Sequence, residues 1–143
     1  MGIKFNERGQ AYPDRIVPMT AKAFEKNTLT EIYWLGNAGA LINSCGTTIM
    51  IDPVLSGFDM PLLINVPLTE AQVPNLDAIL LTHCDNDHYS RDTCAALASV
   101  VSEFHAPKYV ASLLKDELGI RGIGHDMINS FKAVWILGNL LIL

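Results

Sequence analysis

Four side chains that commonly bind metal ions fall within one short stretch, His83, Asp85, Asp87 and His88. Neutral imidazole and carboxylate together suit zinc, manganese or iron(II). His83 and Asp85 are two residues apart, so on an extended segment both side chains point the same way. Asp87 and His88 enter a tighter turn, where their side chains can diverge toward a second metal. Such a cluster can hold up to two ions and activate a bound water for hydrolysis.

The same stretch has a simpler interpretation, a polar turn at the end of a strand in which Asp85 and Asn86 stabilise the backbone. The density of ligand-type side chains favours the metal site. Cys84 is expected to point away from the site and to pack as a small hydrophobe. His105 and His125 are each able to replace a missing ligand, but we expect a solvated or hydrogen-bonded histidine at both positions.

The segments around the cluster predict a strand-to-helix corner. Residues 76–81 are largely apolar and predict a buried strand, and Ser90 is placed to cap the helix that follows. Residues 103–105 predict a short strand. A second helix is expected to begin at Pro107 and to end at Gly119.

Upstream, β-branched and apolar runs at 30–35, 40–43 and 47–51 predict three antiparallel strands joined by tight turns. Residues 53–75 carry four prolines and predict a long connection, either a lid or a loop packed on the core. Residues 121–125 have a loop-like pattern. Strands followed by strand, helix, strand and helix predict an α/β domain whose helices cover a sheet.

Composition narrows the classes of partner. The 143 residues are 50% hydrophobic and 17% charged, with a net charge of -5, which argues against nucleic acid or an anionic membrane surface. Three cysteines without paired spacing are typical of a reduced, cytoplasmic protein. The polar start, with no signal-like segment, supports the same location. The apolar run 135–143 is shorter than the roughly 20 residues that span a bilayer.

The cluster resembles the metallo-β-lactamase superfamily, whose signature is His-x-His-x-Asp-His at the end of a strand. In residues 83–88, Asp85 stands where the second histidine normally stands. The nearer resemblance is to the branch with ascorbate-phosphate lactonase and the N-acyl-phosphatidylethanolamine phospholipases. Proteins of that branch carry Trp-x-Gly-His-Ala-x-x-x-Ile ahead of Ile-Asp-Pro, and this chain has related segments at 34–42 and 51–53. We expect Trp34 itself to be a core residue.

The resemblance implies the site roles. His83 and Asp85 would bind a first metal, and Asp87 and His88 a second, with Asp87 also orienting the nucleophilic water as the catalytic residue. The carboxylate of Asp85 is a harder ligand than imidazole, which favours manganese or iron over zinc.

Two further residues are expected to support the ligands without binding metal. Asp52 lies at a strand end beside the site. Asn37 stands where the family has histidine, so any role of that histidine is lost. The sequence predicts no substrate-binding residues.

The family fold is a four-layer αββα sandwich of two similar halves, and the remaining ligands come from the second half. The motif-bearing core covers about 29–120, so we expect residues 1–143 to be a single truncated domain, the N-terminal β-sheet half with helices on one face. The apolar segment 131–143 is atypical and is expected to mediate a homo-oligomer.

The leading hypothesis is a metal-dependent hydrolase that acts on a lactone, ester or phosphodiester through metal-bound water. The small-molecule substrate is unknown. The alternative is a catalytically incomplete fragment that survives as a homo-oligomer or that binds a single metal, for example through His83, Asp85 and water.

Overall fold

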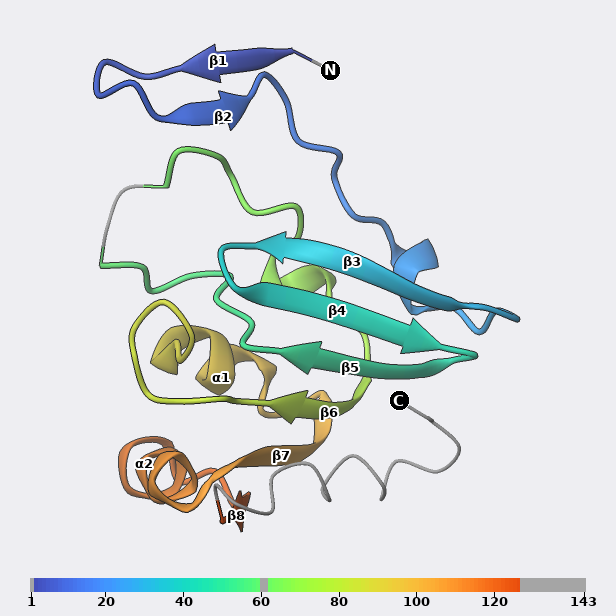
Figure 1. Ribbon diagram of the computed structural model, residues 1–143. Coiled ribbons are helices and arrows are strands. Elements are labelled where there is room, and N and C mark those ends of the chain that lie inside the picture. Colours follow the sequence, from blue (N-terminus) through green and yellow to red (C-terminus); the bar gives the residue numbers. More distant parts are fainter. Residues whose placement is uncertain (1, 60–61, 127–143) are drawn as a thin grey trace.

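A six-stranded sheet forms the centre of the computed structural model, which describes residues 2–59 and 62–126 (Figure 1). The homo-oligomer expected from residues 131–143 rests on a segment outside these ranges. The strand order in the sheet is β3-β4-β5-β6-β7-β8. These strands are β3 (Thr30–Gly36), β4 (Gly39–Ser44), β5 (Thr47–Ile51), β6 (Leu76–Leu80), β7 (Val101–Pro107) and β8 (Gly122–His125).

The pairing of neighbouring strands changes once across the sheet, from antiparallel to parallel. Strands β3, β4 and β5 pair antiparallel, as the sequence predicts, whereas β5 to β8 pair in parallel. The sequence prediction of an α/β fold is therefore confirmed. Because the parallel strands run the same way, their carboxyl ends meet at one edge of the sheet.

Strand β8 corrects the prediction of a loop at 121–125. A short glycine-rich segment has weak β propensity, so its pattern gives no strand signal. Its glycines fit a strand that lies close under a helix. A Cβ on Gly122 would come within 3.0 Å of Leu114 Cδ1, and one on Gly124 within 3.2 Å of Lys108 Cα.

Both α-helices, α1 (Arg91–Leu97) and α2 (Lys108–Leu118), pack on the same face of the sheet. Ser90 caps α1, since its Oγ accepts a hydrogen bond from Thr93 N at 3.1 Å. Gly119 ends α2 with a φ of 69°, as predicted. Neither helix, nor any other in 2–59 and 62–126, is long and apolar enough to cross a bilayer. The main core joins the two helices to the sheet through Leu35, Leu41, Met50, Ile79, Cys94, Leu97, Phe104, Val110 and Leu114.

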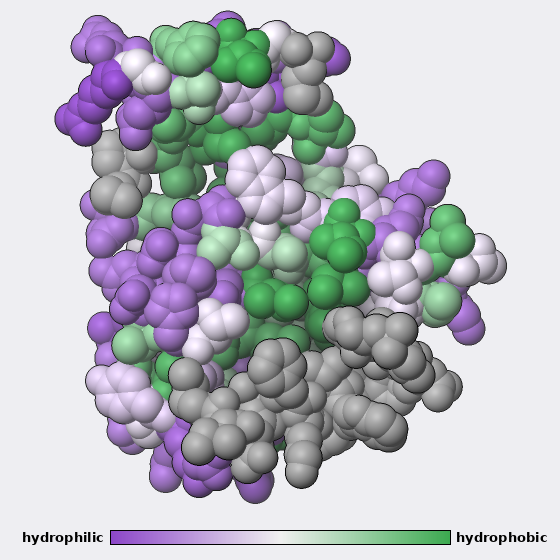
Figure 2. Space-filling model, in the orientation of Figure 1, coloured by the Kyte–Doolittle hydropathy of each residue, from purple (hydrophilic) through white to green (hydrophobic). Residues whose placement is uncertain are grey.

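The opposite face of the sheet carries a second, smaller apolar cluster built on Ile42, Ile49 and Ala78. Figure 2 shows apolar side chains gathered in the middle of the visible face. Trp34 belongs to this face and is 62% exposed, so its prediction as a core residue is wrong. Side chains alternate along a strand, and the neighbouring Leu35 takes the position that faces the main core.

The segment before β3 contains a hairpin that the sequence did not reveal and a short helix in the region 21–26, where the sequence suggests one capped by Thr20. A hairpin of β1 (Ile3–Phe5) and β2 (Ala11–Pro13) precedes a 3-10 helix, η1 (Ala21–Phe24). Thr20 precedes η1 but makes no side-chain cap. The hairpin strands are only three residues long and largely exposed, so they carry no periodic apolar signal.

The connection after β5 is tied to α1 over its first residues. Thr93 Oγ1 accepts hydrogen bonds from Leu55 N at 3.0 Å and from Ser56 N at 3.1 Å. Ser90 Oγ donates to Ser56 O at 2.6 Å, and Ser56 Oγ donates to Glu70 at the start of the 3-10 helix η2 (Glu70–Gln72). This part of the connection therefore packs on the core instead of moving as a lid.

We predict that the buried and exposed cysteines differ sharply in reactivity. Burial raises the pKa of the Cys94 thiol to about 12, so its thiolate fraction at pH 8 is roughly 10⁻⁴. Cys45 is exposed at the β4–β5 turn. Iodoacetamide should therefore modify Cys45 in the folded chain and reach Cys94 only after denaturant is added, as read by peptide mass spectrometry. Equal labelling of the two thiols without denaturant would contradict this packing.

Candidate metal centre

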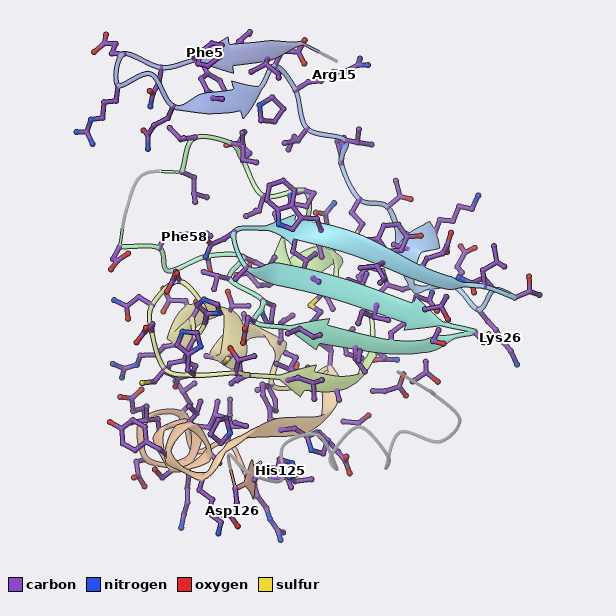
Figure 3. The ribbon with its side chains drawn as sticks, in the orientation of Figure 1. Phe5, Arg15, Lys26, Phe58, His125 and Asp126 are labelled. Atoms are coloured by element: carbon purple, nitrogen blue, oxygen red, sulfur yellow. The ribbon has the colours of Figure 1, made fainter. Side chains whose placement is uncertain are left out.

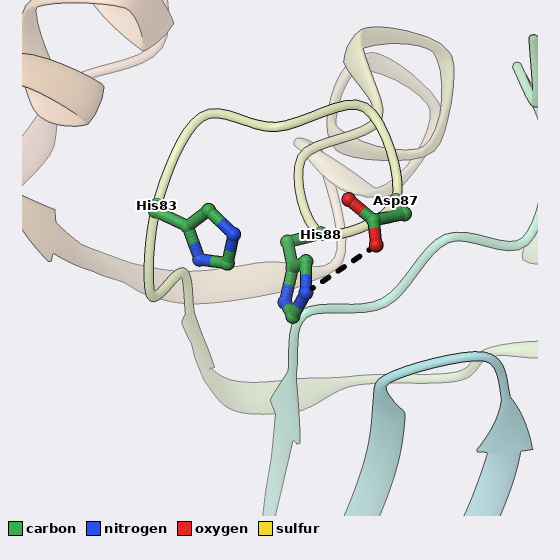
Figure 4. A group of neighbouring side chains, drawn as sticks. All are labelled: His83, Asp87 and His88. Atoms are coloured by element: carbon green, nitrogen blue, oxygen red, sulfur yellow. Dashed lines mark ion pairs between the residues drawn. The ribbon is translucent and has the colours of Figure 1, made fainter.

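The predicted ligand cluster lies in the loop between β6 and α1, at the carboxyl edge of the parallel strands. His83, Asp87 and His88 each offer one ligand atom, and these atoms lie within 4.8 Å of one another (Figure 4). The imidazole rings of His83 and His88 have centroids 3.9 Å apart. His88 Nε2 is 3.6 Å from Asp87 Oδ2. Two imidazoles and a carboxylate form the ligand set of many iron(II), manganese and zinc sites, so the donors fit a divalent ion.

Asp85, the fourth expected ligand, is near this group but outside it. Its Oδ2 is 3.4 Å from His83 Nε2, and its side chain is 73% exposed. The backbone of Asp85 has a structural role, because its carbonyl accepts hydrogen bonds from His88 N and Tyr89 N, both at 2.8 Å. Asn86 Nδ2 donates to Asp59 Oδ2 at 3.0 Å. The turn is thus closed by the backbone carbonyl of Asp85, and the side chain of Asn86 bonds to Asp59 and not to the turn backbone.

Asp52 connects the ends of β5 and β6 to the ligand loop. Its carboxylate belongs to a residue only 3% exposed and accepts from Thr82 N at 2.7 Å and Thr82 Oγ1 at 2.6 Å. Its Oδ2 is also 2.8 Å from His88 Nδ1. Asp52, which the sequence predicts as a supporting residue, therefore contacts the ligand residue His88 directly.

The same carboxylate sets the tautomers of both histidines. An ionised carboxylate only accepts, so His88 carries its proton on Nδ1. The Thr82 hydroxyl uses its single proton on Asp52, so at 2.9 Å from His83 Nδ1 it must accept. Both rings then present the lone pair of Nε2, an assignment from the hydrogen-bond network. Thr82 supports both ligand histidines, a role that the sequence patterns did not predict, although Thr82 directly precedes His83 in the chain.

Asn37 holds the loop from the other side. It occupies the β3–β4 turn with a φ of 50°, a conformation that asparagine tolerates better than most residues. Its Nδ2 donates to the backbone carbonyl of Asp87, and its own carbonyl accepts from Trp34 Nε1 at 2.9 Å. The hairpin therefore fixes the backbone of a ligand residue that lies fifty positions further along the chain.

The remaining histidines lie outside the ligand group and are hydrogen-bonded to each other. His105 is 3% exposed, and its Nδ1 is 3.0 Å from His125 Nε2. Neither therefore replaces a ligand. Cys84 is half-buried and packs against the main core, as expected for a small apolar side chain.

Comparison with known proteins identifies related chains. Residues 33–127 match the model of the metallo-beta-lactamase superfamily. A UPF0173 metal-dependent hydrolase of Myxococcus xanthus (strain DK1622) is 39% identical over 82 residues, which are 57% of this chain and 27% of the relative. The chain thus spans about a quarter of that relative's length.

Among solved structures, CmlA, a diiron beta-hydroxylase from Streptomyces venezuelae, superposes with a TM-score of 0.54. It shares 25% sequence identity, and the match covers 68% of this chain and 21% of that one.

We predict that Asp52→Asn weakens metal binding. The asparagine side chain has one oxygen that accepts hydrogen bonds and an NH2 group that only donates. It therefore cannot accept from both Thr82 and His88 as the carboxylate does, and His88 loses its orientation. Loss of such a supporting partner costs about 10–100-fold in metal affinity. Competition titration with Zn²⁺ and Mn²⁺ measures the change.

The matched control is Asp59→Asn, which changes a carboxylate near Asn86 that does not contact a ligand side chain. It should bind both ions like the unmodified chain. Equal affinity of the Asp52→Asn variant would contradict the support role.

Proposed function

The chain belongs to the metallo-beta-lactamase superfamily, and from this premise we propose that it is a metal-dependent hydrolase. The observation that carries the proposal is the convergence of His83, Asp87 and His88 within 4.8 Å at one edge of the sheet. The match to a metal-dependent hydrolase of Myxococcus xanthus supports the same reaction class.

Three residues of the chain would have separate roles in metal binding and hydrolysis. His83 and His88 would hold the ion through Nε2, because their Nδ1 atoms are engaged with Thr82 and Asp52. Asp87 has a side chain that is 57% exposed, so its carboxylate can reach both an ion and a water molecule. A bound divalent ion supplies a water whose pKa is lowered toward neutrality and an electrophile for the scissile group. Asp87 would orient that water.

The proposed substrates are a lactone, an ester or a phosphodiester, as in the branch with ascorbate-phosphate lactonase. Two motif segments support this branch. Asn37 of the first segment contacts Asp87, and Asp52 of the second contacts His88. The two segments that resemble motifs of the branch therefore meet at the same ligand loop, and Asn37 makes its contact from the position where the branch has histidine.

The described residues favour one ion over two. Asp85 lies outside the three-residue group, and the part of the chain at 2–59 and 62–126 offers no other group of three ligand-type side chains. We propose that this chain binds a single ion through His83, Asp87 and His88. The donor set accommodates zinc, manganese or iron, and because the similar structure CmlA is a diiron protein, iron belongs among the metals to test.

We predict that the two aspartates of the loop contribute unequally to metal binding. Asp87→Asn should lower affinity for Mn²⁺ and Zn²⁺ by at least about 10-fold, because it removes a ligand from the group. Asp85→Asn is the matched variant and should change affinity by less than about threefold. Titration with elemental analysis should give about one ion per chain. Equal losses for both variants, or two tightly held ions, would contradict the single-ion site.

We predict measurable hydrolysis only after metal loading. Chain loaded with Zn²⁺, Mn²⁺ or, without oxygen, Fe²⁺ should cleave members of a panel of δ-valerolactone, p-nitrophenyl acetate and bis(p-nitrophenyl) phosphate. Asp87→Asn should lower kcat by about 10²-fold or more, since the water loses its orientation. A chain that retains no metal above background and shows no rate on any substrate would refute the proposed activity.

A further inference from the structure

A pocket of about 280 Å³ lies directly beside His83. Its wall is formed by residues 82–84 of the ligand loop, residues 107–110 at the start of α2, and residues 125–126 at the end of β8. It opens at the carboxyl ends of the parallel strands, where ligands bind in α/β sheets. Pro107, Tyr109 and Val110 give it an apolar side.

At the polar side of the pocket, three side chains are linked to one another by hydrogen bonds. His105 Nε2 is 3.0 Å from Glu103 Oε2, and His105 Nδ1 is 3.0 Å from His125 Nε2. An ionised carboxylate only accepts, so His105 carries its proton on Nε2 and its Nδ1 accepts from His125 Nε2. Within 2–59 and 62–126, no side chain or backbone group is hydrogen-bonded to Nδ1 of His125, which lines the pocket that His83 also lines.

The series Glu103, His105 and His125 places a buried imidazole between two polar partners. His105 is 3% exposed, and a buried imidazole needs a partner at each nitrogen. An apolar side chain would fill the same space without that requirement. The arrangement of carboxylate, buried imidazole and partly exposed imidazole orients the last ring and fixes its tautomer. Figure 3 shows His125 beside Asp126 at the end of β8.

We propose that the pocket receives the ester or lactone group of a substrate with a small apolar substituent, and that His125 transfers a proton there. Glu103 and His105 are positioning residues for this step. The inference rests on the proposed hydrolase function and adds a proton-transfer residue and a substrate class to it.

The step balances with one water. The water oxygen forms a bond to the carbonyl carbon while the π electron pair of the carbonyl moves onto its oxygen, and a proton of the water passes to His125 Nδ1. The carbonyl π bond then re-forms as the bond between that carbon and the leaving oxygen breaks, and the electron pair of the broken bond stays on the leaving oxygen. That oxygen takes the proton back from His125 Nδ1, so ester and water give acid and alcohol, and His125 is restored.

The surroundings of His125 suit a base. Burial, and then the neighbouring His105, lower the pKa of His125, so its ring is neutral at pH 7. Lys108 and Asp126, which line the same pocket, are paired with each other at 2.8 Å.

The test compares substrates with different leaving groups in the metal-loaded chain. A lactone needs a proton on its alkoxide, whereas p-nitrophenolate leaves without one. His125→Gln should therefore lower kcat on both substrates, because the ring accepts the proton of the attacking water, but the loss on δ-valerolactone, about 10²-fold, should be about tenfold larger than the loss on p-nitrophenyl acetate. Glu103→Gln should show the same pattern with a smaller loss. Glu31→Gln, a matched change on the far edge strand β3, should leave both rates unchanged.

Nitrogen NMR of the metal-free chain gives an independent readout. The imidazole resonances should place the protons of His105 and His125 on Nε2, and Glu103→Gln should shift those of His105. Protons on Nδ1 of His125 would overturn the relay.

The kinetic outcomes separate this inference from the function it rests on. If the unmodified chain hydrolyses both substrates, equal losses for His125→Gln overturn the return of the proton to the leaving oxygen. No loss on either substrate overturns the whole proton-transfer role, and in both cases the hydrolase stands. No hydrolysis by the unmodified chain with any of the three metals overturns the hydrolase, and the proton-transfer step with it.

Discussion

The buried carboxylate of Asp52 is the interaction on which the candidate site depends. A charged group that is 3% exposed is costly unless its lone pairs are used, and here Thr82 and His88 use them. Removing any one partner would leave a buried charge incompletely compensated. The same carboxylate therefore fixes the end of β6, the ring of His88 and, through Thr82, the ring of His83.

The sheet topology makes this possible. The change from antiparallel to parallel pairing occurs between β5 and β6, so Asp52 and Thr82, which follow these strands, lie side by side. Asp52 N also donates to Leu80 O at 2.9 Å. The hairpin of β3 and β4 turns at the same edge, which brings Asn37 to the ligand loop. One edge of one sheet thus collects the ligands, their supports and the neighbouring pocket.

The site is compact and one-sided. All three ligand-type side chains come from a single loop, and the groups behind them come from the strand ends. A loop alone would not hold two imidazoles and a carboxylate in a fixed arrangement, because its backbone makes few hydrogen bonds of its own. Its hydrogen bonds to Asp52 and Asn37 provide the rigidity that a metal centre needs. This explains why residues without ligand chemistry matter as much to the proposed function as the ligands.

The sequence by itself determined the features that depend on local chemistry. Strands of β-branched residues, the Ser90 cap, the Gly119 stop and the ligand types between 83 and 88 are all visible in short windows, because propensity and capping act over a few residues. Only the tertiary structure decided which of these groups meet. Trp34 is exposed because Leu35 faces the core, and Asp87 belongs to the ligand group whereas Asp85 lies outside it. His105 and His125 meet because parallel pairing of β7 and β8 brings strand ends twenty residues apart together, and strand pairing over such a distance leaves no trace in a local pattern.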